Sequence, residues 1–542
     1  MSTKNRGSWT TATRAPLAFF LVMMGWVGPA CADVTLPALF SDGMVLQRDM
    51  NVPIWGWADP GEKITITIPN QQLTAVADDK GRWRATFEPL AAGGMMDIVV
   101  KGNNEVKIKD VQIGDVWLCS GQSNMEWRLA DSRDADLEMP AAVYPNIRLF
   151  TIGGEGKDTP QEKLQGNWEK CTPQTAAEFS AVGYFFGRQM HQNVKVPIGL
   201  IDNAWGGSAC EAWVPREKLE ANPLFQPMLA AYDEQIAEFN QLPGKNYAEK
   251  LPAWQKRATA AQQAGEPDPP GTPWWSNPIT GQYRPANLYN ARIAPLIPFA
   301  IRGVIWYQGE SNVRRAYEYD ELFPLMITTW REAWRQGEFP FLFVQLADFL
   351  PEQEQPDDSG WAELRAAQTA TLDKTPNTGQ AVIIDLGETN DIHPRNKQDV
   401  AKRLSRLALA KSYGQKIAAD SARYKSMYKQ GDRILIRFQG VNGKLRSLDD
   451  KPLTGFAIAG SDRKWVWANA KIVSDSEVEV RSDKVRDPFA VRYGWADNPV
   501  CNLYDTAHLP VTPFRTDQWP GASNPPKKAE PPKKADAPKK AA

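Results

Sequence analysis

Histidine is scarce in this chain, with only 3 among 542 residues. A mechanism that needs an imidazole base therefore has three candidates, His191, His393 and His508. An excess of either charge is also lacking, because 63 Lys and Arg balance 64 Asp and Glu. Nucleic-acid-binding proteins usually carry a basic face, so this balance argues against that class. The hydrophobic content of 42% excludes a chain that is disordered throughout.

Long apolar runs are nearly absent. The one clear case, residues 15–28, follows basic residues and precedes an Ala-Cys-Ala sequence at 30–32. This pattern predicts a signal peptide over residues 1–32, cleaved before Asp33. The run is shorter than the roughly 20 residues of a membrane-spanning helix. We expect a mature protein without a membrane span, either periplasmic or secreted.

Cysteine is sparse as well, and its spacing matches no zinc site. Cys119 ends the apolar run DVWLC, so we expect it to pack as a small buried hydrophobe. No disulfide is assigned from the spacing, and neither a metal nor another cofactor is predicted. Tryptophan, by contrast, is abundant at 21 residues, which is typical of a loop-rich enzyme or a sugar binder.

The pattern of apolar residues changes twice along the chain. Residues 33–110 hold short alternating runs such as KITITI and RWRATF between turn signals, which predicts an N-terminal β-sandwich. From 111 to 414, fully apolar strand runs alternate with long helical stretches, which predicts a parallel sheet covered on both faces. A polar, Trp-bearing insertion is expected at about 216–290. Residues 415–517 predict a second β-rich module, and 518–542 a disordered Pro/Lys tail.

The sharpest local signal follows the run DVWLC, which leads directly into Ser-Gly-Gln-Ser-Asn. Functional groups in parallel α/β sheets lie at the carboxyl ends of strands, so Ser123 would be presented there. A serine nucleophile needs a neighbouring base and an oxyanion site. A Ser-Asn pair after a strand can equally cap a helix. This motif alone leaves both interpretations open.

Two more strand ends carry glycines, which let a ligand approach the backbone closely. Gly206 and Gly207 follow the run GLIDNAW, and Gly309 follows GVIWYQ. Beside the latter, Gln308 and Asn312 have side-chain amides that can donate to an oxyanion. Each segment by itself could be a simple turn, but three such turns at three strand ends favour one convergent site.

His393 is the best candidate for the base. It lies just after the strand-like run QAVIIDL, whereas His191 lies in an amphipathic helix and His508 in the C-terminal module. Asp391 is two residues before His393, and a carboxylate beside an imidazole orients it and stabilises the imidazolium. The same Asp could instead cap the following helix.

The motifs GQSNMEW, WGGSACEAW, WYQGESN and DIHP occur in this order. With them the chain resembles the sialate O-acetylesterase-like branch of the SGNH hydrolases over nearly all of residues 33–517. The resemblance implies a flavodoxin-like three-layer α/β sandwich with a parallel sheet, flanked by β-sandwich-like modules. It also implies a metal-free serine esterase acting on acetylated sugars, with Ser123 as the nucleophile, Gly207 or Gly206 as a donor, and His393 as the base.

Two positions depart from the superfamily pattern. The superfamily acid lies three residues before the histidine, where this chain has Asn390, so Asp391 is the expected acid and Asp385 and Glu388 are alternatives. The superfamily Asn lies two residues after its glycine, whereas here it lies three after. We therefore expect Gln308 in the oxyanion hole and keep Asn312 as the alternative.

The substrate class stays open at this stage. A sialate carboxylate would favour an Arg in the pocket. Acetylated hemicellulose-type oligosaccharides would favour aromatic platforms, with Trp205 and Trp213, and also Trp274 and Trp275, as candidates. The Trp-rich insertion favours a hemicellulose-type or general glycan esterase. The alternative from another class is a non-catalytic carbohydrate-binding protein built on a decayed esterase.

Overall fold

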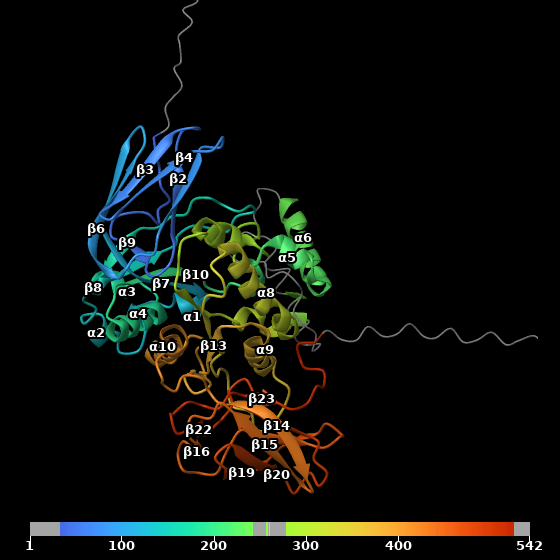
Figure 1. The fold of residues 1–542 in the computed structure, drawn as a ribbon. Coiled ribbons are helices and arrows are strands. Elements are labelled where there is room, and N and C mark those ends of the chain that lie inside the picture. Colours follow the sequence, from blue (N-terminus) through green and yellow to red (C-terminus); the bar gives the residue numbers. More distant parts are fainter. Residues whose placement is uncertain (1–32, 242–255, 258, 261–277, 525–542) are drawn as a thin grey trace, which may run out of the picture.

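The structure is a computed structural model that describes residues 33–241, 256–257, 259–260 and 278–524 (Figure 1). A β-rich N-terminal part, a central α/β part and a β-rich C-terminal part follow one another from top to bottom of Figure 1. The predicted signal peptide, most of the predicted tail, Trp274 and Trp275 lie outside the described residues. Within the described ranges, no helix is long and apolar enough to cross a membrane.

The central sheet has the strand order β13-β12-β11-β7-β10-β8-β9. Neighbouring strands run parallel except β8 and β9, which are antiparallel. When the edge strands β8 and β9 are left out, the remaining strands lie in the order β10, β7, β11, β12, β13. Numbered along the chain, this order is 2-1-3-4-5, as in flavodoxin-like folds. The strands are β7 (Glu105–Gly121), β8 (Tyr144–Thr151), β9 (Trp168–Cys171), β10 (Ile198–Ala204), β11 (Gly303–Tyr307), β12 (Phe341–Val344) and β13 (Thr378–Ala381).

Helices cover both faces of this sheet. Alternate strand residues point to opposite faces, so each face has its own core. Val116 and Leu118 of β7 pack in one core with α8 and α9, and Trp117 and Cys119 pack in another with α4 and α10. The mixed α/β class is thereby confirmed, as is the burial of Cys119, which is 0% exposed. The covering helices are α4 (Ala181–Val194), α8 (Ala316–Trp334), α9 (Gly360–Lys374) and α10 (Lys397–Tyr413).

The N-terminal module shares a strand with the central sheet. The first half of β7 pairs with β6, and its second half pairs with β10 and β11. The expected boundary between residues 110 and 111 therefore falls inside one continuous strand of 17 residues. The other strands of the module are β1 (Val45–Gln47), β2 (Val52–Trp57), β3 (Lys63–Ile68), β4 (Gln71–Val76), β5 (Arg82–Phe87) and β6 (Gly93–Lys101).

The C-terminal module is made of short antiparallel strands around a third core. The buried guanidinium of Arg365 in α9 donates to the carbonyls of Ala496 and Asp497, which ties this module to the central part. Its strands are β14 (Arg423–Gln430), β15 (Arg433–Gln439), β16 (Leu445–Ser447), β17 (Phe456–Ala459), β18 (Trp465–Trp467), β19 (Asn469–Ser474), β20 (Glu477–Arg481), β21 (Ala490–Tyr493), β22 (Leu503–Asp505) and β23 (Phe514–Arg515).

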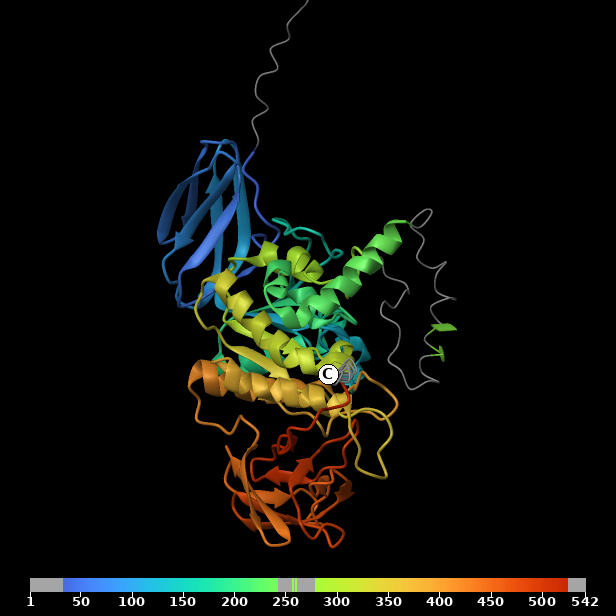
Figure 2. The same cartoon turned by 90° about the vertical axis from the view of Figure 1, so that its right-hand side faces the viewer.

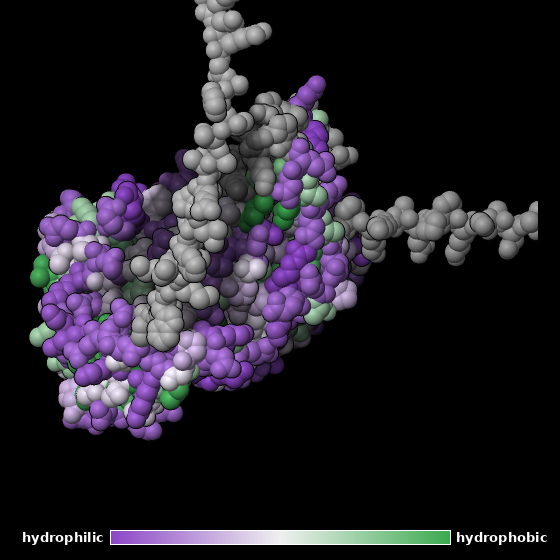
Figure 3. Space-filling model, turned by 90° about the horizontal axis from the view of Figure 1, so that it is seen from above, coloured by the Kyte–Doolittle hydropathy of each residue, from purple (hydrophilic) through white to green (hydrophobic). Residues whose placement is uncertain are grey.

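The expected insertion begins with helices. Its α6 is the green helix that projects from the body in Figure 2. The face seen from above is mostly hydrophilic, with small apolar patches between polar side chains (Figure 3). The remaining α-helices among the described residues are α1 (Ser123–Glu126), α2 (Ala135–Glu138), α3 (Pro173–Ala177), α5 (Arg216–Glu220) and α6 (Gln226–Asn240).

Candidate active site

Ser123 and His393 meet although 270 positions separate them in the chain. Ser123 begins α1, directly after β7, and His393 lies in the loop between β13 and α10. The Oγ of Ser123 lies 2.9 Å from Nε2 of His393. Nucleophile and base in a serine enzyme need a separation of about 2.6–3.2 Å. Ser123 follows the carboxyl end of β7, the first strand of the sheet, between β10 and β11, where the strand order reverses. This is the ligand-binding position of such sheets.

His393 has an aromatic neighbour on its ring and a carboxylate at its edge. Trp127 stacks on the imidazole with ring centroids 4.9 Å apart. Oδ1 of Asp391 lies 3.5 Å from Nδ1 and accepts the backbone N–H of His393 at 2.9 Å. Desolvation and the charge of Lys397 lower the pKa of His393, and Asp391 opposes them. The lowered pKa favours the neutral imidazole, which is the form that accepts a proton.

The alternative acids have other partners. Asp385 pairs with Arg403 and accepts the hydroxyl of Tyr504. Glu388 accepts the backbone N–H of Arg395 at 2.7 Å. In the described part of the chain, Asp391 is the carboxylate within 4.0 Å of His393. The structure thus places the predicted Ser, His and Asp together.

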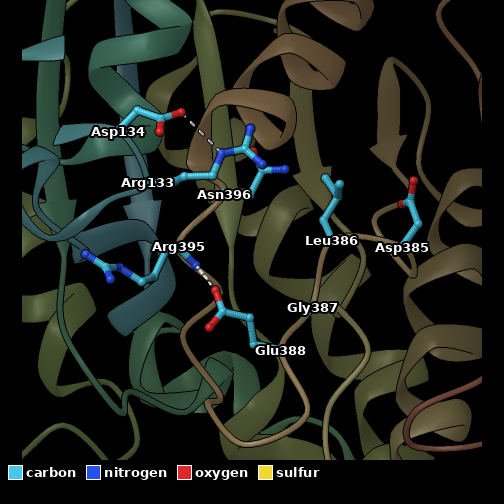
Figure 4. A pocket seen from close by; sticks show the side chains of 8 residues that line it. All are labelled: Arg133, Asp134, Asp385, Leu386, Gly387, Glu388, Arg395 and Asn396. Atoms are coloured by element: carbon cyan, nitrogen blue, oxygen red, sulfur yellow. Dashed lines mark hydrogen bonds and ion pairs between the residues drawn. The ribbon is translucent and has the colours of Figure 1, made fainter. Parts of the chain in front are cut away.

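The loop that carries the base also borders a polar cavity of about 420 Å³ (Figure 4). In Figure 4 the Arg395 backbone meets the carboxylate of Glu388, which closes the loop on itself. Neither Ser123 nor His393 is among the residues that line it. Its lining residues are Arg133, Asp134, Asp385, Leu386, Gly387, Glu388, Arg395 and Asn396.

The backbone N–H groups of Ser123, Gly206 and Gly207 are the candidates for holding an oxyanion. Gly206 lies against the nucleophile, because a Cβ on it would come within 3.6 Å of the Ser123 Cβ. Its N–H, however, donates to Oε2 of Glu126 at 2.7 Å. No described residue accepts the N–H of Gly207, whose φ of +69° suits glycine. This difference favours Gly207 over Gly206 as the donor, beside the N–H of Ser123 at the start of α1.

The side-chain amide of Gln308 does not have the position expected for an oxyanion donor. Its Nε2 donates to the Ser208 carbonyl at 3.1 Å and to Oδ1 of Asn312 at 2.7 Å, so both amide hydrogens are used. Nδ2 of Asn312 donates to Oε2 of Glu211 at 2.8 Å. Both amides therefore brace the turn that carries the glycines, and the expectation for Gln308 is corrected. The sequence could not show this, because it depends on which buried acceptors surround the amide.

The expectation that Trp213 binds substrate is wrong. Its side chain is 0% exposed, packs edge-on against Trp306, and donates its Nε1–H to Oγ of Ser208 at 3.0 Å. Trp205 is half-buried, and the guanidinium of Arg292 lies 4.7 Å from its ring. Trp205 remains a candidate for substrate binding, because it lies directly before Gly206.

Three residues near Ser123 and Gly207 were not predicted from the sequence to belong to the site. Glu126, three residues after Ser123, is exposed beside Gly206. Gln282 and Tyr283 lie against Gly207, 3.5 Å and 3.4 Å from where its Cβ would be. Glu126 lies within the GQSNMEW motif and could have been noticed there. Gln282 and Tyr283 come from the far end of the insertion, and no spacing pointed to them.

A serine and a histidine in contact at the carboxyl end of a parallel sheet, near backbone N–H groups that donate to no described residue, are typical of a serine ester hydrolase. A family model described as "Carbohydrate esterase, sialic acid-specific acetylesterase" matches residues 113–244 and 274–410. The chain belongs to this family of carbohydrate esterases.

Two sialate O-acetylesterases and one carbohydrate acetylesterase are similar to this chain over most of its length. Sialate O-acetylesterase of Mus musculus is 30% identical over 87% of this chain and 92% of its own. The Homo sapiens enzyme is 29% identical over 89% and 92%. The crystal structure of a carbohydrate acetylesterase from Xanthomonas citri has 38% identity and a TM-score of 0.76, and the match covers 90% of this chain and all of that one. The protein is thus a carboxylic ester hydrolase.

Proposed function

We propose that this protein is an exported esterase that removes O-acetyl groups from neutral glycans through an acetyl-enzyme intermediate. The observation that supports it most directly is the 2.9 Å approach of Ser123 Oγ to His393 Nε2. The N–H of Gly207, which donates to no described residue, follows Gly206 next to this pair. The basic and apolar pattern of residues 1–32 supports export. Release of acetate from acetylated oligosaccharides tests the activity.

The geometry suggests the order of proton transfers. Nε2 of His393 takes the proton of Ser123 as Oγ attacks the acetyl carbonyl carbon. The N–H groups of Ser123 and Gly207 hold the resulting oxyanion. The imidazolium then gives its proton to the leaving sugar oxygen, and the acetyl group stays on Ser123. Water, activated by the same imidazole, attacks the acetyl-enzyme and releases acetate.

The charges around the nucleophile support a neutral substrate over a sialate. The exposed Glu126 carboxylate lies beside Gly206 and would repel a carboxylated sugar. Arg128, the nearest arginine along the chain, is paired with Asp131 and Glu178. Arg292, whose charge acts on Glu126, is buried and donates to backbone carbonyls. An anion therefore meets a like charge close to the reacting serine, and Arg128 does not offset it.

Replacing Glu126 tests this selectivity. We expect the wild type to have a higher kcat/KM on a neutral acetylated oligosaccharide than on a 9-O-acetylated sialic acid. In Glu126→Gln, the value for the sialate should rise several-fold while the neutral value changes little, because a like charge near the substrate is removed. The Gln Oε1 can still accept the Gly206 N–H. The measurement is kcat/KM on both substrates at mildly alkaline pH.

Glu220→Gln, which changes an exposed carboxylate on α5, is the matched control and should leave both values unchanged. A wild type that prefers the sialate would contradict the proposed substrate class. An equal loss on both substrates in Glu126→Gln would instead assign the carboxylate to bracing Gly206.

Ester hydrolysis should survive EDTA, because Ser123 and His393 supply nucleophile and base without an ion. Among the described residues, no group of three or more His, Cys, Asp and Glu side chains could hold a metal. The assay is acetate release after dialysis against the chelator, with a buffer-dialysed sample as control. Activity that falls on chelation and returns with a divalent cation would refute the metal-free mechanism.

A further inference from the structure

A lysine lies buried next to the catalytic pair. Lys397 is the first residue of α10, four positions after His393, and its residue surface is 0% exposed. Lysine is almost never fully buried unless it is paired. Its Nζ lies 2.6 Å from Oδ1 of Asn124, the residue that follows the nucleophile. Nothing in the proton transfers proposed above uses this cation.

Asn124 extends the contact to two further segments. Its Nδ2 donates to Oε1 of Glu310 at 2.7 Å and to the carbonyl of Ile392 at 3.0 Å. Ile392 directly precedes the base, and Glu310 begins the segment after β11. The Asn124 side chain thus connects α1, which begins with Ser123, to the segment after β11 and to the loop that carries His393. Lys397 holds the oxygen of the same side chain. Oε2 of Glu310 is buried and has no hydrogen-bond partner among the described residues. Asn124 therefore bridges two buried groups of opposite charge, Glu310 and Lys397, whose charges interact through it.

The same ammonium group also lies against aromatic rings. Nζ of Lys397 is 5.7 Å from the centre of the Trp127 ring and 5.5 Å from that of Tyr307. Trp127 in turn stacks on His393. The cation therefore contacts the ring on which the base rests, as well as the residue beside the nucleophile.

From this geometry we infer that Lys397 is a positioning residue for the esterase reaction: through Asn124 it fixes the separation of Ser123 and His393, and its charge favours the neutral base. The inference rests on the proposed function, in which Ser123 and His393 react with the ester. Two buried opposite charges are otherwise a poor source of stability, because apolar residues of similar size would often serve as well.

The electrostatics of the cluster agree with this role. Burial lowers the pKa of Lys397 to about 7, and the carboxylates that face it, Glu310, Asp391 and Glu388, oppose that shift. At pH values where His393 titrates, Lys397 is therefore largely a cation. Its charge lowers the pKa of His393. Removing it should raise the pKa of His393, so that a higher pH is needed to obtain the neutral base.

Substitution of Lys397 by Met tests the inference on p-nitrophenyl acetate. We expect kcat of Lys397→Met to fall about tenfold to a hundredfold, because a small displacement of the pair costs that much. The acid limb of the kcat/KM profile should move to higher pH by roughly half a unit or more. Lys402→Met, which changes an exposed lysine on the same helix, should match the wild type in both respects.

A second variant separates this role from stability. Lys397→Met leaves Glu310 buried without its cation, so its Tm should fall. Lys397→Met/Glu310→Gln removes both charges and should recover Tm while the acid limb stays displaced. A double variant that regains both Tm and the wild-type pH profile would overturn the inference and leave Lys397 as a stabilising partner only. So would a folded Lys397→Met with unchanged kcat and acid limb. Ser123→Ala is run alongside, because activity in that variant would refute the proposed function itself.

Discussion

Ser123→Ala should reduce acetate release by about 10⁴-fold or more, because the hydroxyl that forms the acetyl-enzyme is lost. Its Oγ contacts His393 at 2.9 Å in a part-buried position. Losing such a hydrogen bond costs the fold only about 1 kcal/mol, so Tm should change little. The measurement is kcat on an acetylated oligosaccharide together with thermal unfolding.

The chain offers a matched control in a neighbouring serine. Oγ of Ser311 donates to the carbonyl of Gly207 at 2.9 Å and lies in the same site, but it has no base beside it. Ser311→Ala should therefore keep most of the activity and remain open to covalent labelling by a fluorophosphonate, whereas Ser123→Ala should not be labelled. Retained turnover in Ser123→Ala at unchanged Tm would move the nucleophile to Ser311 or Ser208.

Ser123 and Gly207 could be singled out from the sequence because each lies two or three residues after a buried strand. His393 could be singled out because it lies in the loop that follows another strand, β13. Parallel strands place their carboxyl ends at one edge, so three such ends predict one site without any knowledge of contacts. The α/β class followed from the same runs. Finding these positions needed only periodicity, chain order and the chemistry of each residue type, and the family resemblance added the donor role of Gly207.

The sequence could not predict the roles of three side chains, those of Gln308, Trp213 and Lys397. A side-chain amide can serve an oxyanion only if its hydrogens are free, and those of Gln308 are used by Ser208 and Asn312. Trp213 resembles a sugar platform in the sequence, but it is enclosed by other aromatic rings. The role of Lys397 depends on Asn124, which is 273 positions away. Such roles follow from tertiary contacts that no local spacing encodes.

The strand β7 shows the same limit for domain boundaries. Its first half alternates exposed and buried residues as a strand of the N-terminal module, and its second half is buried throughout. The change in pattern at about residue 110 lies inside this strand. It marks a change in what covers one strand, and the strand itself continues unbroken from one sheet region to the next.

Asp391→Asn should reduce kcat by roughly 10²–10³-fold, less than the 10⁴-fold known for a buried triad Asp. The carboxylate is half exposed and its Oδ1 lies 3.5 Å from Nδ1 of His393, so its hold on the ring is weaker than in a buried triad. An Asn amide can donate to Nδ1 and so place the imidazole proton on Nε2, which then cannot accept from Ser123. The measurement is kcat on one acetylated sugar across a pH series.

The pH dependence of the activity distinguishes Asp391 from Lys397, because the two side chains shift the pKa of His393 in opposite directions. Asp391 raises the pKa of His393, whereas desolvation and Lys397 lower it. Without the carboxylate the pKa falls further, so the acid limb of Asp391→Asn should move to lower pH while the plateau drops. In Lys397→Met it should move to higher pH. Glu388→Gln keeps an acceptor for the Arg395 N–H and should behave as wild type. A near-wild-type Asp391→Asn would mean that Ser123 and His393 work as a dyad, and a greater loss in Glu388→Gln would make Glu388 the acid.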